Sequence, residues 1–172
     1  LGRDLNLENP TKLGDLAVSI ERGARIPAQE LDELTIDSDS RITYLRLSDI
    51  SDGRISDDRP RLRQIDCDTE RYWLKTGDLI VSKNGAPFKI AVAEIAENDI
   101  VLANGNLYIS RLNTDIIDPY FIAAFLSSDD GKEALERYVV GTAIPNLPLK
   151  NLKELQIPVP PMEKQKEIAS AY

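Results

Sequence analysis

Short stretches in which apolar and polar residues alternate dominate the chain up to residue 112. Alternation with a period of two places every second side chain on one face, which is the pattern of a half-buried β-strand. The turn-forming pairs Asp52-Gly53 and Asn84-Gly85 follow two of these stretches. The pattern predicts strands over residues 12–20, 42–50, 78–83, 89–96 and 100–112.

Helical signals gather in the last third of the chain. Asp118 precedes Pro119, the arrangement of an N-cap residue and a first helical position, and the acidic pair Asp129-Asp130 is placed to cap a second helix. Strands followed by helices indicate an α+β fold, which we expect to be one compact domain with a twisted mixed or antiparallel sheet and a few helices. The predicted helical segments are residues 29–34, 120–126 and 131–140.

The C-terminal thirty residues carry the most distinctive pattern. A Gly141-Thr142 turn is followed by a leucine-spaced amphipathic segment and then by the β-like stretch Ile157-Pro158-Val159. Consecutive prolines forbid helix immediately before them, and an acidic first turn then favours a new helix from about Met162. Gly141 is also suited to end the helix before it, so a turn and a helix C-cap both remain open.

Length and composition describe a globular domain. The 172 residues suffice for one domain with a full core, and 42% hydrophobic and 29% charged residues are ordinary values. No apolar run approaches the roughly 20 residues that span a bilayer, and no signal segment precedes the domain. The first residue is not Met, so we expect a piece of a longer protein. The single cysteine excludes an internal disulfide framework and favours a cytoplasmic location.

The charge distribution modifies what the net charge suggests. A formal charge of −8 argues against a simple nucleic-acid binder, because lysine and arginine supply most phosphate neutralisation. Residues 41–64, however, concentrate arginine and contain no lysine, which indicates a local basic patch on an acidic body. The arginines of this stretch, called the arginine stretch below, are Arg41, Arg46, Arg54, Arg59, Arg61 and Arg63.

Catalytic chemistry has little support. The chain has no histidine, and Cys67 lies between Asp66 and Asp68, whose charges disfavour a reactive thiolate. Asp118-Pro119-Tyr120-Phe121 lacks the second proline of the Asp-Pro-Pro-Tyr motif of amino-methyltransferases, and a helix start explains it better. No phosphate-binding or dinucleotide-binding glycine motif and no metal-ligand spacing occurs. We therefore expect no catalytic residue, no metal and no cofactor.

The arginine stretch is the strongest functional feature. Arg59, Arg61 and Arg63 alternate, so in extended backbone they project from one face and can follow a phosphate track. The alternative is a solvated strand neutralised by nearby aspartates (Asp57, Asp58 and Asp66). Arg46 and Arg54 join the predicted DNA contacts. If DNA is bound there, we expect Arg61→Glu to weaken duplex binding.

Two further segments supply predicted DNA contacts. The loop from Lys83 to Lys89 carries two cations for phosphates and Asn84 for a base, although a structural hairpin explains it equally well. Thr142 offers a hydroxyl donor beside the backbone of the Gly-Thr turn, an arrangement suited to positioning phosphate.

Four blocks of sequence, taken in order, resemble the target recognition domains of type I restriction-modification DNA specificity subunits. The C-terminal pattern is similar to the end of such a domain, where the chain enters a long spacer helix. The Lys89-Ile90-Ala91 block and the ending from Gln165 to Tyr172 also resemble domains fused to N6-adenine methylases, and the sequence leaves both origins open. The four blocks are residues 12–23, 44–55, 74–91 and 118–128.

The resemblance implies an α+β domain that reads one half of a split DNA target and performs no chemistry itself. It implies double-stranded DNA, a methylation subunit and a restriction subunit as partners, with pairing through the spacer helix. Met162, Ile168 and Ala169 would then face a partner or the other spacer helix. The alternative is a different class of function: an acidic protein-interaction module that does not read DNA. The implied divisions are a leader (1–11), the recognition domain (12–161) and the start of the spacer helix (162–172).

Overall fold

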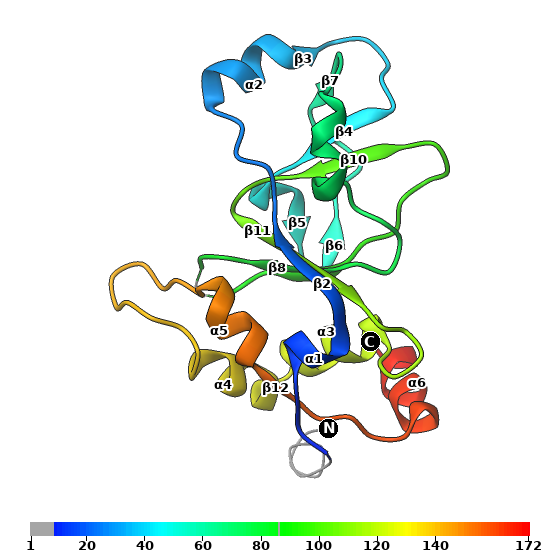
Figure 1. Ribbon diagram of the computed structural model, residues 1–172, viewed down its shortest axis with the longest axis vertical. Helices are drawn as coiled ribbons and strands as arrows, with labels where there is room; N and C mark the ends of the chain where they lie inside the picture. Colours follow the sequence, from blue (N-terminus) through cyan, green and yellow to red (C-terminus); the bar gives the residue numbers. More distant parts are fainter. Residues whose placement is uncertain (1–8, 86) are drawn as a thin grey trace.

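The computed structural model describes residues 9–85 and 87–172. The molecule is elongated, and its elements form successive layers along the long axis (Figure 1). Helices occupy one end, a four-stranded sheet crosses the middle, and a second four-stranded sheet with the helix α2 (Ala28–Leu34) occupies the other end. We call these two sheets the lower sheet and the upper sheet.

The lower sheet is antiparallel throughout. Its strands β8 and β11 are almost entirely buried because the sheet is covered on both faces. Covering on both faces explains the near-continuous apolar sequence Leu79-Ile80-Val81. In spatial order the strands are β2 (Ala17–Arg22), β11 (Leu107–Leu112), β8 (Leu79–Ser82) and β9 (Ile90–Val92).

The upper sheet is mixed. Its first two strands pair in parallel and the others in antiparallel fashion. In spatial order they are β10 (Ile100–Ala103), β4 (Ile42–Leu45), β7 (Arg61–Leu62) and β3 (Thr35–Ile36). Two small antiparallel pairs complete the strands: β1 (Thr11–Lys12) with β12 (Gln156–Ile157), and β5 (Ile50–Ser51) with β6 (Arg54–Ile55).

Short helices surround these sheets. The helices of the lower layer are α1 (Leu13–Leu16), α3 (Pro119–Ser127), α4 (Asp129–Glu136), α5 (Leu149–Glu154) and α6 (Met162–Ser170). Two 3-10 helices, η2 (Leu47–Asp49) and η3 (Cys67–Tyr72), flank the upper sheet. No helix in the described part of the chain combines the length and apolar character needed to cross a bilayer.

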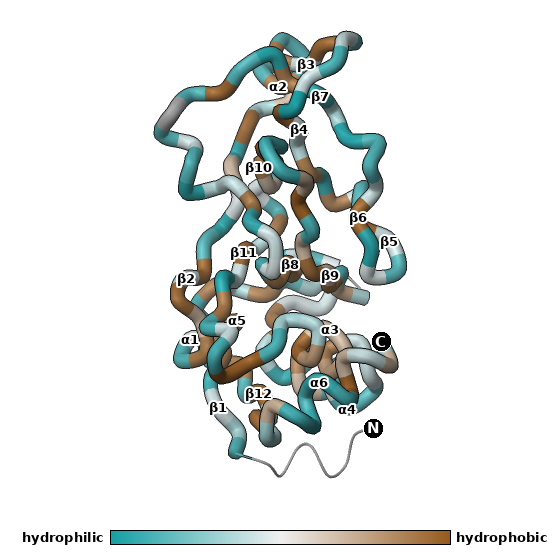
Figure 2. Tube along the Cα trace, turned by 90° about the vertical axis from the view of Figure 1, so that its right-hand side faces the viewer, coloured by the Kyte–Doolittle hydropathy of each residue, from teal (hydrophilic) through white to brown (hydrophobic). Residues whose placement is uncertain are grey.

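Three apolar clusters hold the layers together. The largest lies between the lower sheet and the helices, where Tyr108 and Val81 meet Phe121 and Phe125 of α3. The second lies between the two sheets and contains Ile80. The third lies under α2 around Tyr44, Leu62 and Leu102. The hydropathy colouring of Figure 2 shows apolar segments in all layers, interrupted by polar connections. Along β4, β8, β9, β10 and β11, successive residues point to opposite faces and therefore contribute to two different clusters.

The α+β class is confirmed, but the strands are divided between two four-stranded sheets rather than gathered in one. The predicted strand over residues 100–112 is wrong as a single element: it breaks at Asn104–Asn106 into β10 and β11, which belong to different sheets. Residues 42–50 are likewise interrupted by η2, and residues 12–20 by α1. Local alternation cannot reveal such breaks, because each piece keeps the period of two.

The predicted helix starts are partly confirmed. Asp118 caps α3 by accepting a hydrogen bond from the Tyr120 amide, with Pro119 at the first helical position. The cap of α4 was predicted wrongly: Ser128 accepts from the Gly131 amide, and Asp129 and Asp130 lie in the first turn. This helix ends at Glu136, so Gly141, with φ of +84°, does not cap it.

Helix α6 packs onto its own domain. Gln165 is 1% exposed and bonds to two backbone groups before α3, at Ile116 and Asp118, and to the Pro160 carbonyl oxygen before its own helix. Ile168 and Ala169 pack against the largest apolar cluster, so the expectation that they face a partner is wrong. The amphipathic pattern predicted that the face of α6 with Ile168 and Ala169 is covered, but not that the domain's own apolar cluster covers it. At the other end, residues 1–8 of the predicted leader lie outside the described residues, whereas Thr11 pairs with Ile157.

Candidate nucleic-acid interface

The alternation of the arginine stretch is present around β7. Leu62 is fully buried, and the flanking Arg61 and Arg63 are exposed. Arg59 precedes the strand and is only half-buried, with two hydrogen bonds: Nε to Thr43 Oγ1 at 3.0 Å and Nη1 to the Ser56 carbonyl oxygen at 2.8 Å. Arg59 therefore braces the β6–β7 connection, leaving Arg61 and Arg63 as the exposed pair.

The partners of these arginines differ from those expected. Arg61 Nη1 lies 3.7 Å from Asp39 Oδ1 and donates to the Ser40 carbonyl oxygen at 3.4 Å. The predicted neutralising aspartates (Asp57, Asp58 and Asp66) form no ion pair with them in the described part of the chain. Both contacts of Arg61 are long and exposed, so its guanidinium can exchange them for another anion at little cost.

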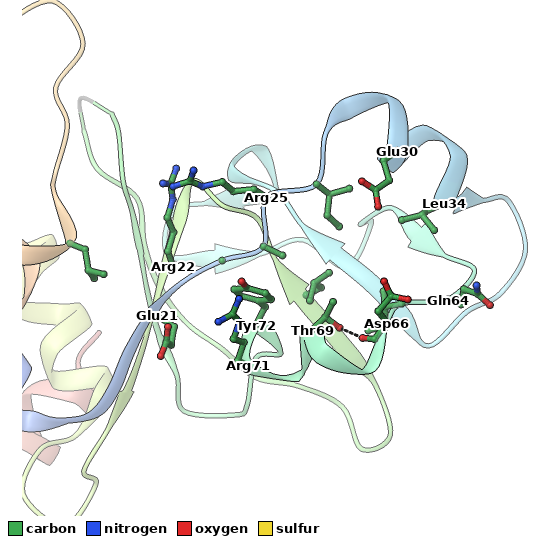
Figure 3. A pocket seen from close by; sticks show the side chains of 16 residues that line it. Glu21, Arg22, Arg25, Glu30, Leu34, Gln64, Asp66, Thr69, Arg71 and Tyr72 are labelled. Atoms are coloured by element: carbon green, nitrogen blue, oxygen red, sulfur yellow. Dashed lines mark hydrogen bonds between the residues drawn. The ribbon is translucent and has the colours of Figure 1, made fainter.

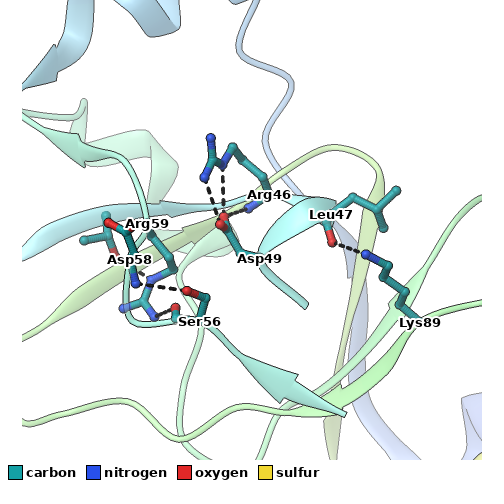
Figure 4. Close-up of polar contacts among 8 residues, drawn as sticks. Arg46, Leu47, Asp49, Ser56, Asp58, Arg59 and Lys89 are labelled. Carbon is teal, nitrogen blue, oxygen red and sulfur yellow. Dashed lines mark hydrogen bonds and ion pairs between the residues drawn. The ribbon is translucent and has the colours of Figure 1, made fainter. Parts of the chain in front are cut away.

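Arg46 is held by a carboxylate of its own turn. Its Nε and Nη2 donate to Asp49 at 3.1 and 2.9 Å, and its backbone amide donates to the same carboxylate at 2.8 Å (Figure 4). The hydrogen bond with Asp49 raises the pKa of Arg46. Lys89 is also engaged, since its Nζ donates to the Leu47 carbonyl oxygen at 2.9 Å. Arg54 is exposed and makes no side-chain hydrogen bond with other described residues.

Lys83, Asn84 and Thr142 are brought together by the loop after α4. Lys83 Nζ donates to Asn146 Oδ1 at 2.8 Å, and Asn84 Nδ2 lies 3.4 Å from both Asn146 Oδ1 and the Pro145 carbonyl oxygen. Reciprocal backbone bonds between Val140 and Asn146 close this loop, leaving Thr142 exposed at its tip. Lys83 and Asn84 therefore anchor the loop, which favours the structural interpretation of the two side chains.

The predicted contacts thus form two groups. The arginine stretch runs from β4 through β6 to β7, and Lys89 joins it by its hydrogen bond to Leu47 of η2, whereas Lys83 and Asn84 follow β8 of the lower sheet and contact the loop that carries Thr142. Asn146 was not singled out from the sequence, because a lone asparagine before a leucine carries no local signal. Only its position opposite Lys83 in the fold reveals its role.

A groove beside α2 contains three arginines outside the arginine stretch: Arg22, Arg25 and Arg71 (Figure 3). It has a volume of about 590 Å³ and extends from the upper sheet to Leu149 of α5. Arg71 is far in sequence from Arg22 and Arg25, which follow Glu21, so composition windows do not group the three. The adjacent pair Arg71-Tyr72 is the one local signal, and the Arg71 guanidinium lies 4.6 Å from the centre of the Tyr72 ring.

The Asp118–Phe121 segment is a helix start. Asp118 is used as the cap of α3, and the Tyr120 hydroxyl donates to Glu94 Oε1. This hydrogen bond raises the pKa of Tyr120 to about 12. Both polar side chains therefore have structural partners. Among the described residues, no three His, Cys, Asp or Glu side chains are grouped to hold a metal ion. The side chain of Cys67 lies outside what the structure describes.

Sequence comparison identifies one family. The family model described as the type I restriction modification DNA specificity domain matches residues 9–171. A curated relative, the putative type I restriction enzyme MjaX specificity subunit of Methanocaldococcus jannaschii, is 30% identical over 132 residues. That alignment covers 72% of this chain and 30% of the relative, so the chain spans less than a third of the relative's length.

Structural comparison identifies similar folds. A type I restriction-modification S subunit from M. genitalium is matched with a TM-score of 0.58 and 19% identity, over 96% of this chain and 38% of that one. The HsdS subunit of Thermoanaerobacter tengcongensis gives 0.60 and 18%, over 95% and 36%. A chain from a study of the assembly and conformational transition of the type I R-M system gives 0.69 and 23%, over 95% and 40%.

Proposed function

Because the chain belongs to the type I restriction modification DNA specificity domain family, we propose that it recognises a specific sequence in double-stranded DNA. In this proposal it directs a type I methylase and endonuclease complex to one half of a split target site. The observation that carries the proposal is the extent of the family match, residues 9–171, which includes both sheets and the helical layer.

The proposal extends to the organisation of the whole protein. Residues 12–161 are the recognition domain, and residues 162–172 begin a spacer helix through which the protein pairs. A methylation subunit, and in the complete system a restriction subunit, carry the chemistry in the cytoplasm, and this chain contributes recognition without catalysis. The specificity subunit among the curated relatives supports this division of labour.

The accessible members of the predicted contacts are the proposed DNA contacts. Arg54, Arg61, Arg63 and Thr142 have exposed side chains that can reach a phosphate or a base edge. The remaining members have internal hydrogen bonds, and we propose that they shape the surface rather than touch DNA; they are Arg46, Arg59, Lys83, Asn84 and Lys89.

Selection from random-sequence duplex DNA tests this function. The chain is incubated with the random pool at low and at moderate salt, and the retained DNA is sequenced. A half-site reader enriches a short motif, and its binding weakens with salt because phosphate contacts release counterions. Salt-sensitive binding without enrichment would contradict sequence reading and leave electrostatic attachment only.

Absence of binding is informative when the experiment is repeated with the methylation subunit present. If the joined proteins also retain no DNA, the recognition proposal fails, and an acidic protein-interaction module becomes the better account of the surface charge. If the joined proteins enrich a motif that the methylation subunit alone does not, recognition stands and the partner supplies part of the phosphate contacts.

A further inference from the structure

The groove beside α2 has a charged lining that is divided between its ends. In Figure 3, Arg22, Arg25 and Arg71 lie at one end, next to Glu21, and the carboxylates of Glu30 and Asp66 lie at the other. Three cations against one anion make the first end basic, although the whole chain carries −8. An anion entering the groove is therefore drawn toward the arginine end.

None of these three guanidinium groups forms an ion pair with a carboxylate in the described part of the chain. Arg25 and Arg71 are exposed and form no ion pair or hydrogen bond with the other described residues. Arg71 is held over the Tyr72 ring at 4.6 Å, which orients its fork without neutralising it. Arg22 donates through Nε to the Gly105 carbonyl oxygen at 2.6 Å, which fixes its direction. Arg22 and Arg71 are thus oriented, and none of the three arginines is neutralised by a described carboxylate.

The groove and Arg61 lie on opposite faces of the upper sheet. Thr43 pairs with Arg61 in β7 and with Val101 in β10, and residues paired across strands share a face. Leu102 follows Val101, points to the other face, and lines the groove. Contacts of DNA phosphates with the groove and contacts with Arg61 are therefore made on different faces of the upper sheet and can be tested separately.

We propose that the arginine end of this groove, through Arg25 and Arg71, carries the main contacts of the domain with the DNA phosphates. The proposal rests on the proposed function and deepens it by naming the face that DNA approaches. Arginine's planar fork pairs bidentately with phosphate, and an unpaired guanidinium gains that contact without breaking an existing one. Arg59 and Arg61, by contrast, already donate to Thr43, Ser56 and Ser40.

A matched pair of double variants tests the proposal. Arg25→Ala with Arg71→Ala removes two charges from the groove, and Lys132→Ala with Lys166→Ala removes two charges from exposed positions in α4 and α6, outside both the groove and the other proposed DNA contacts. Fluorescence anisotropy measures binding of each chain to a labelled duplex between about 50 and about 200 mM salt. The groove variant should bind about tenfold more weakly, with the log–log salt slope reduced by about 2, whereas the control retains both values.

Conservative replacement separates contact from folding. Arg25→Lys with Arg71→Lys keeps both charges, so it should restore most of the salt slope, and thermal unfolding verifies that each variant is folded. If the control variant loses DNA affinity and the groove variant keeps it, the groove proposal is overturned and the proposed function stays intact. An equal loss of DNA affinity in both variants would show that overall charge, and not the groove, controls binding, and would also overturn the groove proposal. If the unaltered chain enriches no DNA, even with the methylation subunit, the proposed function itself fails.

Discussion

The guanidinium of Arg46 donates two hydrogen bonds, of 3.1 and 2.9 Å, to the carboxylate of Asp49, three residues further along the chain. Asp49 is 4% exposed and also accepts from the Arg46 backbone amide, so the pair closes the η2 turn between β4 and β5. The arginine that appeared to be a DNA contact in the sequence is thus the counter-charge of a buried carboxylate.

Replacing Arg46 should therefore reduce stability. Arg46→Ala leaves the buried Asp49 carboxylate with a single backbone donor, and we expect a loss of about 2 kcal/mol in the free energy of unfolding. Urea denaturation measures this loss. Arg54→Ala, at an exposed side chain without partners among the described residues, should change it by less than about 0.5 kcal/mol. Equal stabilities of the two variants would refute the assigned role of Arg46.

The loop that presents Thr142 should depend on Asn146. Asn146→Ala removes the acceptor of the Lys83 hydrogen bond, so local opening of the loop should become easier by about 1 kcal/mol. Hydrogen exchange should then be about fivefold faster at the amides of Val140 and Leu147, which close and anchor the loop. Lys150→Ala, at an exposed position in α5, provides the control, and unchanged exchange in Asn146→Ala would exclude the anchoring role.

The hydroxyl of Tyr120 should make stability sensitive to alkaline pH. Its hydrogen bond to Glu94 raises the pKa from 10.0 to about 12, so the folded chain holds this proton more tightly than the unfolded chain. The resulting stabilisation is complete below about pH 10 and is lost as the pH rises through about 12.

Urea unfolding of the unaltered chain and of Tyr120→Phe, followed across this range, measures that dependence. The stability difference between the two proteins should shrink as the pH rises from about 10 toward about 12. Taking the difference removes the titration of lysines and other tyrosines that both proteins share. A difference that stays constant over the range would show that the hydroxyl has the same proton affinity in the folded and unfolded chains.

Gln165 should be required for the docking of α6. Its amide donates to the carbonyl oxygens of Pro160 and Ile116 at 2.9 and 3.1 Å and accepts from the Asp118 amide at 2.8 Å. Gln165→Ala leaves these three backbone groups without their partner and should cost about 3 kcal/mol. For a chain of this size that loss lowers the melting temperature by about 10 °C. Lys166→Ala, one residue further along and exposed, should melt as the unaltered chain does.

The sequence determined the elements whose signals are local. The strand at residues 79–82 and the helix that begins after Asp118 were predicted because apolar periodicity and capping operate within one or two turns. The family resemblance also came from the sequence, since its blocks recur in order along the chain. The α+β class follows from the order of these elements alone.

The tertiary structure decided what each functional side chain faces. The sequence predicted Arg46, Lys83 and Lys89 as DNA contacts. Their hydrogen-bond partners are seen only in the folded chain and are Asp49, Asn146 and Leu47, respectively. The same packing brings Arg25 and Arg71, far apart in sequence, to one end of a groove. Charge is a property of residue type, but whether a charge is neutralised depends on its neighbours in space. Those neighbours are set by the register and layering of the two sheets.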